Sequence, residues 1–184
     1  MDAFLWLWLV FAIVWFLAAL ASKRTLRRQT PTGRLLQGGI IALGFFLLFQ
    51  PWNLQPLDVR FVPATQATTF CGIAFTAAGI AFAIWARLTI GRNWSGTVTL
   101  KQDHQLIRNG PYRIVRHPIY SGVLLAMFGT AIGYGKVPCL IGLALTFAGF
   151  WAKWRTEEQF MIEQFGAQYV EYRREVKAII PGLL

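Results

Sequence analysis

Residues 119–151 read IYSGVLLAMFGTAIGYGKVPCLIGLALTFAGFW, two apolar blocks joined only by Gly135 and Lys136. Each block is long enough for an apolar helix, and we expect helices over about 118–134 and 137–153. A joint of this length, with Pro138 nearby, leaves room only for a tight turn. The stretch therefore predicts an antiparallel pair of helices.

Three more apolar blocks precede this pair, at about 3–21, 35–50 and 67–88. The chain has 184 residues and is 55% hydrophobic, more than one soluble core of that size would bury. A transmembrane helix needs about 20 mostly apolar residues, so five of them would use most of the apolar side chains. We therefore predict an all-α integral membrane protein, a single membrane domain over 1–184 with five transmembrane helices and no Rossmann domain.

The charge of +10 comes from 18 Lys and Arg against 8 Asp and Glu. Five of the basic residues follow the first apolar block, whereas in a signal peptide the basic residues precede it. We therefore predict that this block is a helix that is not cleaved off. Basic loops of membrane proteins face the cytoplasm, and the excess need not mean nucleic-acid binding. Alternating the loops places the amino terminus outside and the carboxyl terminus in the cytoplasm.

The tail from Lys153 carries apolar and aromatic residues at helical spacing. We expect an amphipathic helix that continues the last transmembrane helix into the cytoplasm, with a break at Gly166 and an end at Pro181. The residues at this spacing are Phe160, Met161, Phe165, Tyr169 and Tyr172.

Polar side chains able to do chemistry gather in two segments, 92–122 and 153–181. The helical pair brings their ends together, which predicts one site at the cytoplasmic face of the membrane. Nucleotide-binding glycine motifs are absent, and two isolated histidines and two isolated cysteines indicate neither a metal site nor a disulfide. Glu157 and Glu158, near Lys153 and Arg155, either form a solvated face or bind a cationic ligand.

Four pieces of sequence in this half of the chain resemble the isoprenylcysteine carboxyl methyltransferases and the related phospholipid methyltransferases. They are His104-Gln105-Leu106-Ile107, Gly110-Pro111-Tyr112, Arg116-His117-Pro118-Ile119-Tyr120-Ser121-Gly122, and Glu157-Glu158 with the tail through Phe165-Gly166, Tyr169, Tyr172 and Pro181. The resemblance implies a membrane enzyme that uses S-adenosylmethionine without a Rossmann domain. By position, the implied cofactor contacts are His104, Gln105, Leu106, Ile107, Tyr112, His117, Pro118, Ile119, Tyr120, Glu157 and the adjacent Glu158.

The resemblance also implies a lipophilic methyl acceptor, a small molecule or a prenylated peptide, bound near Lys153. We expect Lys153, Arg155 and Glu157 to be catalytic, with Glu157 anchoring the cofactor and a basic side chain holding an anionic acceptor such as a carboxylate. The chain departs from the family at Lys153 and Glu175, where family members often have Arg, and both positions bear on the substrate.

Three alternatives stay open from the sequence. A lipid N-methyltransferase would use the same cofactor with an amine acceptor. The tail and helical pair also resemble the terminal part of the sterol reductases, so an NADPH-dependent enzyme is a second alternative. Those proteins are about twice as long, which argues against it. A non-enzymatic membrane scaffold would bind neither cofactor, and its Glu157→Ala and His117→Ala variants would behave like the parent.

Overall fold

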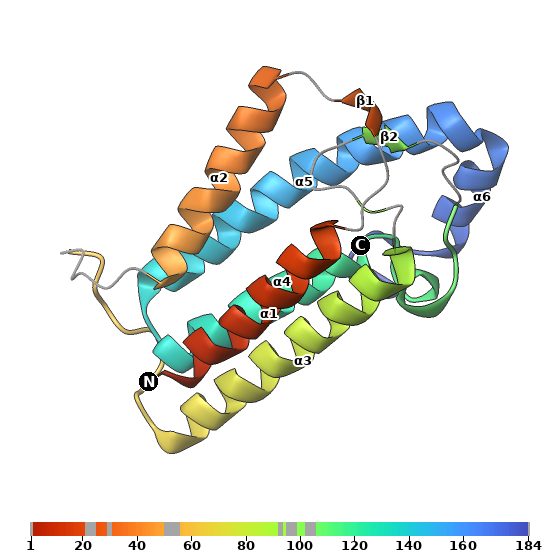
Figure 1. The fold of residues 1–184 in the computed structure, drawn as a ribbon. Helices are drawn as coiled ribbons and strands as arrows, with labels where there is room; N and C mark the ends of the chain where they lie inside the picture. The colour runs from red at the N-terminus through yellow and green to blue at the C-terminus, as the bar shows by residue number, and fades with distance from the viewer. Residues whose placement is uncertain are drawn as a thin grey trace.

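The computed structural model describes residues 2–20, 25–28, 31–49, 56–91, 94, 99–101 and 106–183 (Figure 1). The regular structure within them is helical, apart from a short antiparallel pairing of two strands. The elements are α1 (Ala3–Leu20), β1 (Thr25–Arg28), α2 (Pro31–Phe49), α3 (Gln66–Ile90), β2 (Thr99–Lys101), the 3-10 helix η2 (Gly110–Arg113), α4 (Pro118–Tyr134), α5 (Val137–Phe165) and α6 (Ala167–Glu175).

The predicted apolar helices are all present, but their lengths differ from the prediction. Four helices are long and apolar enough to cross a membrane, α1, α2, α3 and α5, whereas α4 is shorter, at 17 residues. The number of five spans and their orientation therefore stay predictions. Helix α2 begins at Pro31 rather than near 35, because the helix runs past the apolar stretch into the polar residues before it.

The all-α fold class is confirmed, although the prediction did not include the two short strands β1 and β2. They pair in antiparallel fashion, with Thr25 opposite Lys101 and Arg28 opposite Thr99. The two polar segments that contain them were expected to be loops, since each strand is only three or four residues long and neither shows an apolar alternation.

Helix α5 continues without interruption to Phe165, as the spacing in the tail predicted. Its 29 residues span about 44 Å, well beyond the roughly 30 Å of a hydrocarbon core. Gly166 ends it with a positive φ of 53°, a conformation that favours glycine, and α6 then turns back toward the start of α4 (Figure 1). The tail therefore returns to the helical pair.

The helices lie in two groups, α1 with α3 and α4, and α2 along α5 (Figure 1). Glycines allow the closest approaches. A Cβ at Gly79 of α3 would lie 2.4 Å from the backbone nitrogen of Ala126 in α4, and one at Gly142 of α5 would lie 2.4 Å from the carbonyl oxygen of Gly44 in α2. The turn between Tyr134 and Val137 joins the two groups at one end.

Candidate active site

The start of α4 is held in place by the end of the chain. The backbone N–H groups of Arg116 and His117 donate to the carbonyls of Lys177 and Ala178, both at 2.8 Å, and Ser121 Oγ donates to the carbonyl of Ile179 at 2.7 Å. These contacts join residues about 60 positions apart. Sequence reasoning missed them, because backbone pairing leaves no mark on residue type.

Arg116 and Glu158 form an ion pair at the centre of this region. Arg116 donates from Nε and Nη2 to Glu158 Oε1 at 2.9 and 2.7 Å, and both side chains are only 9% exposed. Nη1 of the same guanidinium donates to the backbone carbonyls of Arg173 and Val176. A single buried side chain thus connects α4, α5 and the tail.

Two further side chains, His117 and Arg173, surround Glu158. His117 Nε2 lies 3.1 Å from its Oε1, and Arg173 Nε lies 3.2 Å from its Oε2. Glu158 is therefore engaged on both oxygens by side chains of this protein. These contacts position Arg116 and His117, and the contact of Glu158 with a cofactor stays a prediction. Arg173 is a member of the cluster that the sequence did not single out.

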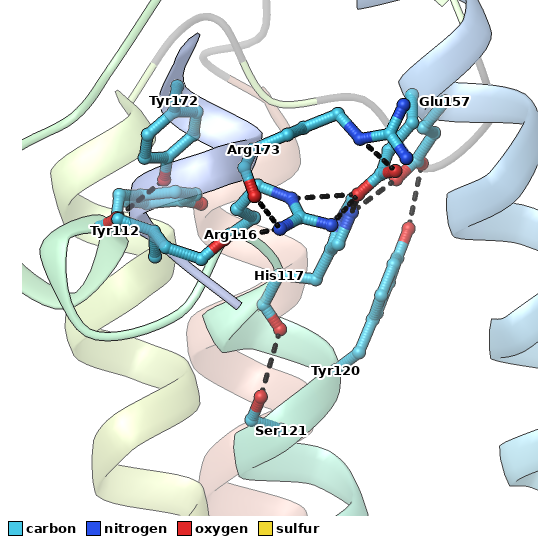
Figure 2. A network of polar contacts seen from close by, with 10 residues as sticks. Tyr112, Arg116, His117, Tyr120, Ser121, Glu157, Tyr172 and Arg173 are labelled. Carbon is cyan, nitrogen blue, oxygen red and sulfur yellow. Dashed lines mark hydrogen bonds and ion pairs between the residues drawn. The ribbon is translucent and has the colours of Figure 1, made fainter. Parts of the chain in front are cut away.

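Glu157 has a different environment, although it is the next residue along the chain. It accepts a hydrogen bond from the Tyr120 hydroxyl at 2.7 Å, and its Oε2 lies 3.7 Å from His117 Nδ1, too far for a hydrogen bond (Figure 2). Its side chain is 21% exposed, against 9% for Glu158. Glu157 is therefore the carboxylate of the pair that retains capacity to accept from a ligand.

Aromatic rings fix the direction of the Tyr120 hydroxyl. The Tyr120 ring stacks with Phe150 at 4.5 Å between centroids and with His117 at 5.5 Å, and His117 also stacks with Trp154. Lys153 Nζ lies 5.5 Å from the centroid of the Tyr120 ring. The structure thus brings together four residues predicted from the sequence: His117, Tyr120, Lys153 and Glu157.

The other predicted cofactor contacts that the structure describes are buried or half-buried. Tyr112 is buried, and its hydroxyl lies 3.5 Å from the carbonyl oxygen of Ala86 in α3, so it faces the helix backbone. Pro118 is buried in the first turn of α4, and Ile119 packs against the core. Leu106 and Ile107 are half-buried, whereas His104 and Gln105 lie outside the described residues.

Arg155 does not join Lys153, contrary to the expectation that either could hold the same acceptor. It lies with Trp151 and Gln159 on a different face of α5, where these residues line a cavity of about 620 Å³ between α5, α6 and the tail. The helix turns by about 100° per residue, so positions two apart point in nearly opposite directions.

Glu175, where the resemblance leads us to expect Arg, has a partner in the structure. Glu175 forms an ion pair with Arg108, whose guanidinium also lies over the ring of Tyr172 at 5.2 Å. The Tyr172 hydroxyl donates to the carbonyl of Tyr112, and burial raises the pKa of Tyr172 to about 12, so the hydroxyl stays protonated at neutral pH. Glu175 therefore helps to fasten α6 to the segment before α4.

Comparisons with known proteins converge on one group. The sequence model of the phospholipid methyltransferase family matches residues 67–168, more than half of the chain. Protein-S-isoprenylcysteine O-methyltransferase B of Arabidopsis thaliana is 33% identical over 99 residues, covering 52% of this chain and 50% of that protein. The corresponding enzyme of Saccharomyces cerevisiae is 31% identical over 121 residues, covering 64% of this chain and 51% of that protein.

The fold is similar to a solved structure of the same group. The eukaryotic intramembrane Ras methyltransferase ICMT, isoprenylcysteine carboxyl methyltransferase, superposes with a TM-score of 0.57 at 26% sequence identity. The match covers 86% of this chain and 55% of that one. The chain spans about half the length of the two curated relatives named above.

Proposed function

Because the chain belongs to the phospholipid methyltransferase family, we propose that it is an S-adenosylmethionine-dependent membrane methyltransferase whose acceptor is a lipophilic carboxylate. The resemblance in its motifs is confirmed by the family match and by the fold it shares with an intramembrane methyltransferase. The names of its relatives, protein-S-isoprenylcysteine O-methyltransferases, support a carboxylate acceptor over an amine. The count of basic residues supports a site at the cytoplasmic face.

The observation that carries this proposal is the contrast between Glu157 and Glu158. Glu158 is engaged by Arg116, His117 and Arg173, whereas Glu157 is oriented by Tyr120 and keeps one oxygen without a hydrogen bond among the described residues. S-adenosylmethionine carries a cationic sulfonium and, at neutral pH, a protonated amino group. A partly exposed carboxylate beside aromatic rings fits both features.

The residues around Glu157 bind and orient rather than react. When bound, S-adenosylmethionine supplies an electrophilic methyl group to a nucleophile placed in line with it. A carboxylate acceptor is ionised at neutral pH, so no side chain has to remove a proton from it. Lys153, next to Tyr120 on the same side of α5 as Glu157, would hold that carboxylate, and the surrounding rings would exclude water.

Binding of labelled S-adenosylmethionine to the detergent-purified chain tests the cofactor assignment. We expect Glu157→Gln to weaken binding roughly tenfold or more, since the negative charge that attracts the cationic cofactor is lost. Glu171→Gln is the matched control, because Glu171 lies exposed on α6 away from the cluster. Equal affinity in parent and Glu157→Gln, or tight NADPH binding with none for S-adenosylmethionine, would contradict the proposal.

Methyl transfer to a small prenylcysteine tests the acceptor. The free carboxylate should be methylated, and the same compound with its carboxyl group amidated should not. Lys153→Gln should raise the KM for the carboxylate while leaving the affinity for S-adenosylmethionine close to that of the parent. Preferential methylation of an amine lipid would instead favour the N-methyltransferase alternative.

A further inference from the structure

The cavity between α5, α6 and the tail is strongly basic. Five of its lining side chains are cationic and one is a carboxylate, Glu158. The cations come from three parts of the chain: Arg116 before α4, Arg155 in α5, and Arg173, Arg174 and Lys177 at the end of α6 and just beyond it. Neither Glu157 nor Tyr120 lines this cavity, so it opens on a different side of the Arg116–Glu158 pair from the proposed cofactor site.

The single carboxylate in the cavity does not balance this charge. Glu158 already pairs with Arg116 and Arg173. Within the described part of the chain, no carboxylate forms an ion pair with Arg155, Arg174 or Lys177. Three cations therefore converge on one cavity without an anionic partner, an arrangement that favours binding of a ligand with a concentrated negative charge.

The depth of the cavity relative to a membrane indicates the kind of anion. About 20 residues of α5, counted from Val137, cross a hydrocarbon core of roughly 30 Å, which brings the helix to the headgroup level near residue 156. Arg155 lies at that level. The wall of the cavity also carries apolar side chains, Trp151 and Leu183, which are 42% and 75% exposed. Trp is typical of the same interfacial zone.

We propose that this cavity binds the phosphate group of an anionic membrane phospholipid. Arg155, Arg174 and Lys177 hold the phosphate, and Trp151 and Leu183 contact the first part of an acyl chain. Arginine suits phosphate because its planar group donates two parallel hydrogen bonds. Since Arg173 and Glu158 link the cavity wall to His117, the bound lipid also supports the position of the tail against α4.

Native mass spectrometry of the detergent-purified chain tests the site without any use of catalysis. Phosphatidylglycerol and phosphatidylcholine with identical acyl chains are titrated separately, and inorganic phosphate is added as a competitor. We expect phosphatidylglycerol to bind more tightly, and each of Arg155→Gln, Arg174→Gln and Lys177→Gln to weaken it about fivefold. The triple variant should bind both lipids equally. Arg113→Gln, an exposed charge change in η2, is the control and should bind like the parent.

Two further measurements keep the result interpretable. Arg174→Lys keeps the charge but loses the paired donors, so its affinity should lie between that of the parent and that of Arg174→Gln. Raising the salt concentration should weaken phosphatidylglycerol binding to the parent but spare phosphatidylcholine. Equal binding of the two lipids by the parent, or an unchanged affinity in a folded triple variant, overturns the proposal. Displacement of the lipid by inorganic phosphate at comparable concentration also overturns it, since the source would then be free phosphate. The outcome does not depend on methyl transfer.

Discussion

Replacement of Glu158 by Ala tests whether the buried ion pair holds the site together. The carboxylate accepts from Arg116 at 2.9 and 2.7 Å and lies 3.1 Å from His117 Nε2, and both members of the pair are 9% exposed. Without it, the Arg116 guanidinium stays buried with only backbone carbonyls as partners. Removal of one member of such a pair costs about 3–5 kcal/mol, so we expect the free energy of unfolding to fall by that amount.

The measurement is denaturant unfolding of the detergent-purified chain, followed by tryptophan fluorescence. Trp154, one of eight tryptophans, stacks on His117 at 6.1 Å between ring centroids and contributes to the signal from the site. Glu158→Gln keeps an acceptor oxygen but loses the charge, so its cost should lie between that of Glu158→Ala and zero. Glu171→Ala on the exposed side of α6 should change the free energy of unfolding by less than about 0.5 kcal/mol.

A double variant separates the charge pair from its packing. Arg116→Met with Glu158→Met removes both charges and fills a similar volume, so its stability should be much closer to the parent than that of Glu158→Ala. Its affinity for S-adenosylmethionine should nevertheless fall, because His117 loses the partner on its Nε2. If Glu158→Ala is as stable as Glu171→Ala, the pair does not hold α4, α5 and the tail together and the reasoning is refuted.

Two other variants probe the scaffold. Gly79→Ala should lower the melting temperature, since the new Cβ would lie 2.4 Å from the backbone nitrogen of Ala126. Gly38→Ala on the exposed side of α2 meets no atom within 4 Å and should stabilise the protein by up to about 1 kcal/mol. A loss of equal size at both positions would contradict the close packing of α3 on α4. Tyr172→Phe should cost about 1 kcal/mol in denaturant unfolding, because the hydrogen bond to the Tyr112 carbonyl is lost, and an unchanged stability would show that this bond does not fasten α6.

Much of the fold was predictable because its causes are local. Apolar blocks separated by short polar joints predict helices and the turn at Gly135 and Lys136, and the spacing of aromatic residues predicts the extension of α5 and its break at Gly166. The motif around His117 predicts the family. Local patterns do not predict the strand pairing of Thr25 with Lys101, since those residues lie far apart in the sequence and neither segment is apolar.

Which role each residue of the site has depends on the tertiary structure. In the sequence, Glu157 and Glu158 are equivalent neighbours, and Lys153 and Arg155 are two similar cations nearby. Each step along α5 turns the side chain by about 100°, so Glu157 meets Tyr120 of α4, while Glu158 meets Arg116 and the tail.

The sequence by itself determined a helical membrane protein with a methyltransferase motif at one end of its helical pair, because hydropathy and motif spacing are properties of short segments. Only the tertiary structure decided which carboxylate is left for a ligand and which cation faces the basic cavity between α5, α6 and the tail. Those choices depend on where α4, α6 and the tail pack around α5, and the partners come from up to about 60 residues away in the chain.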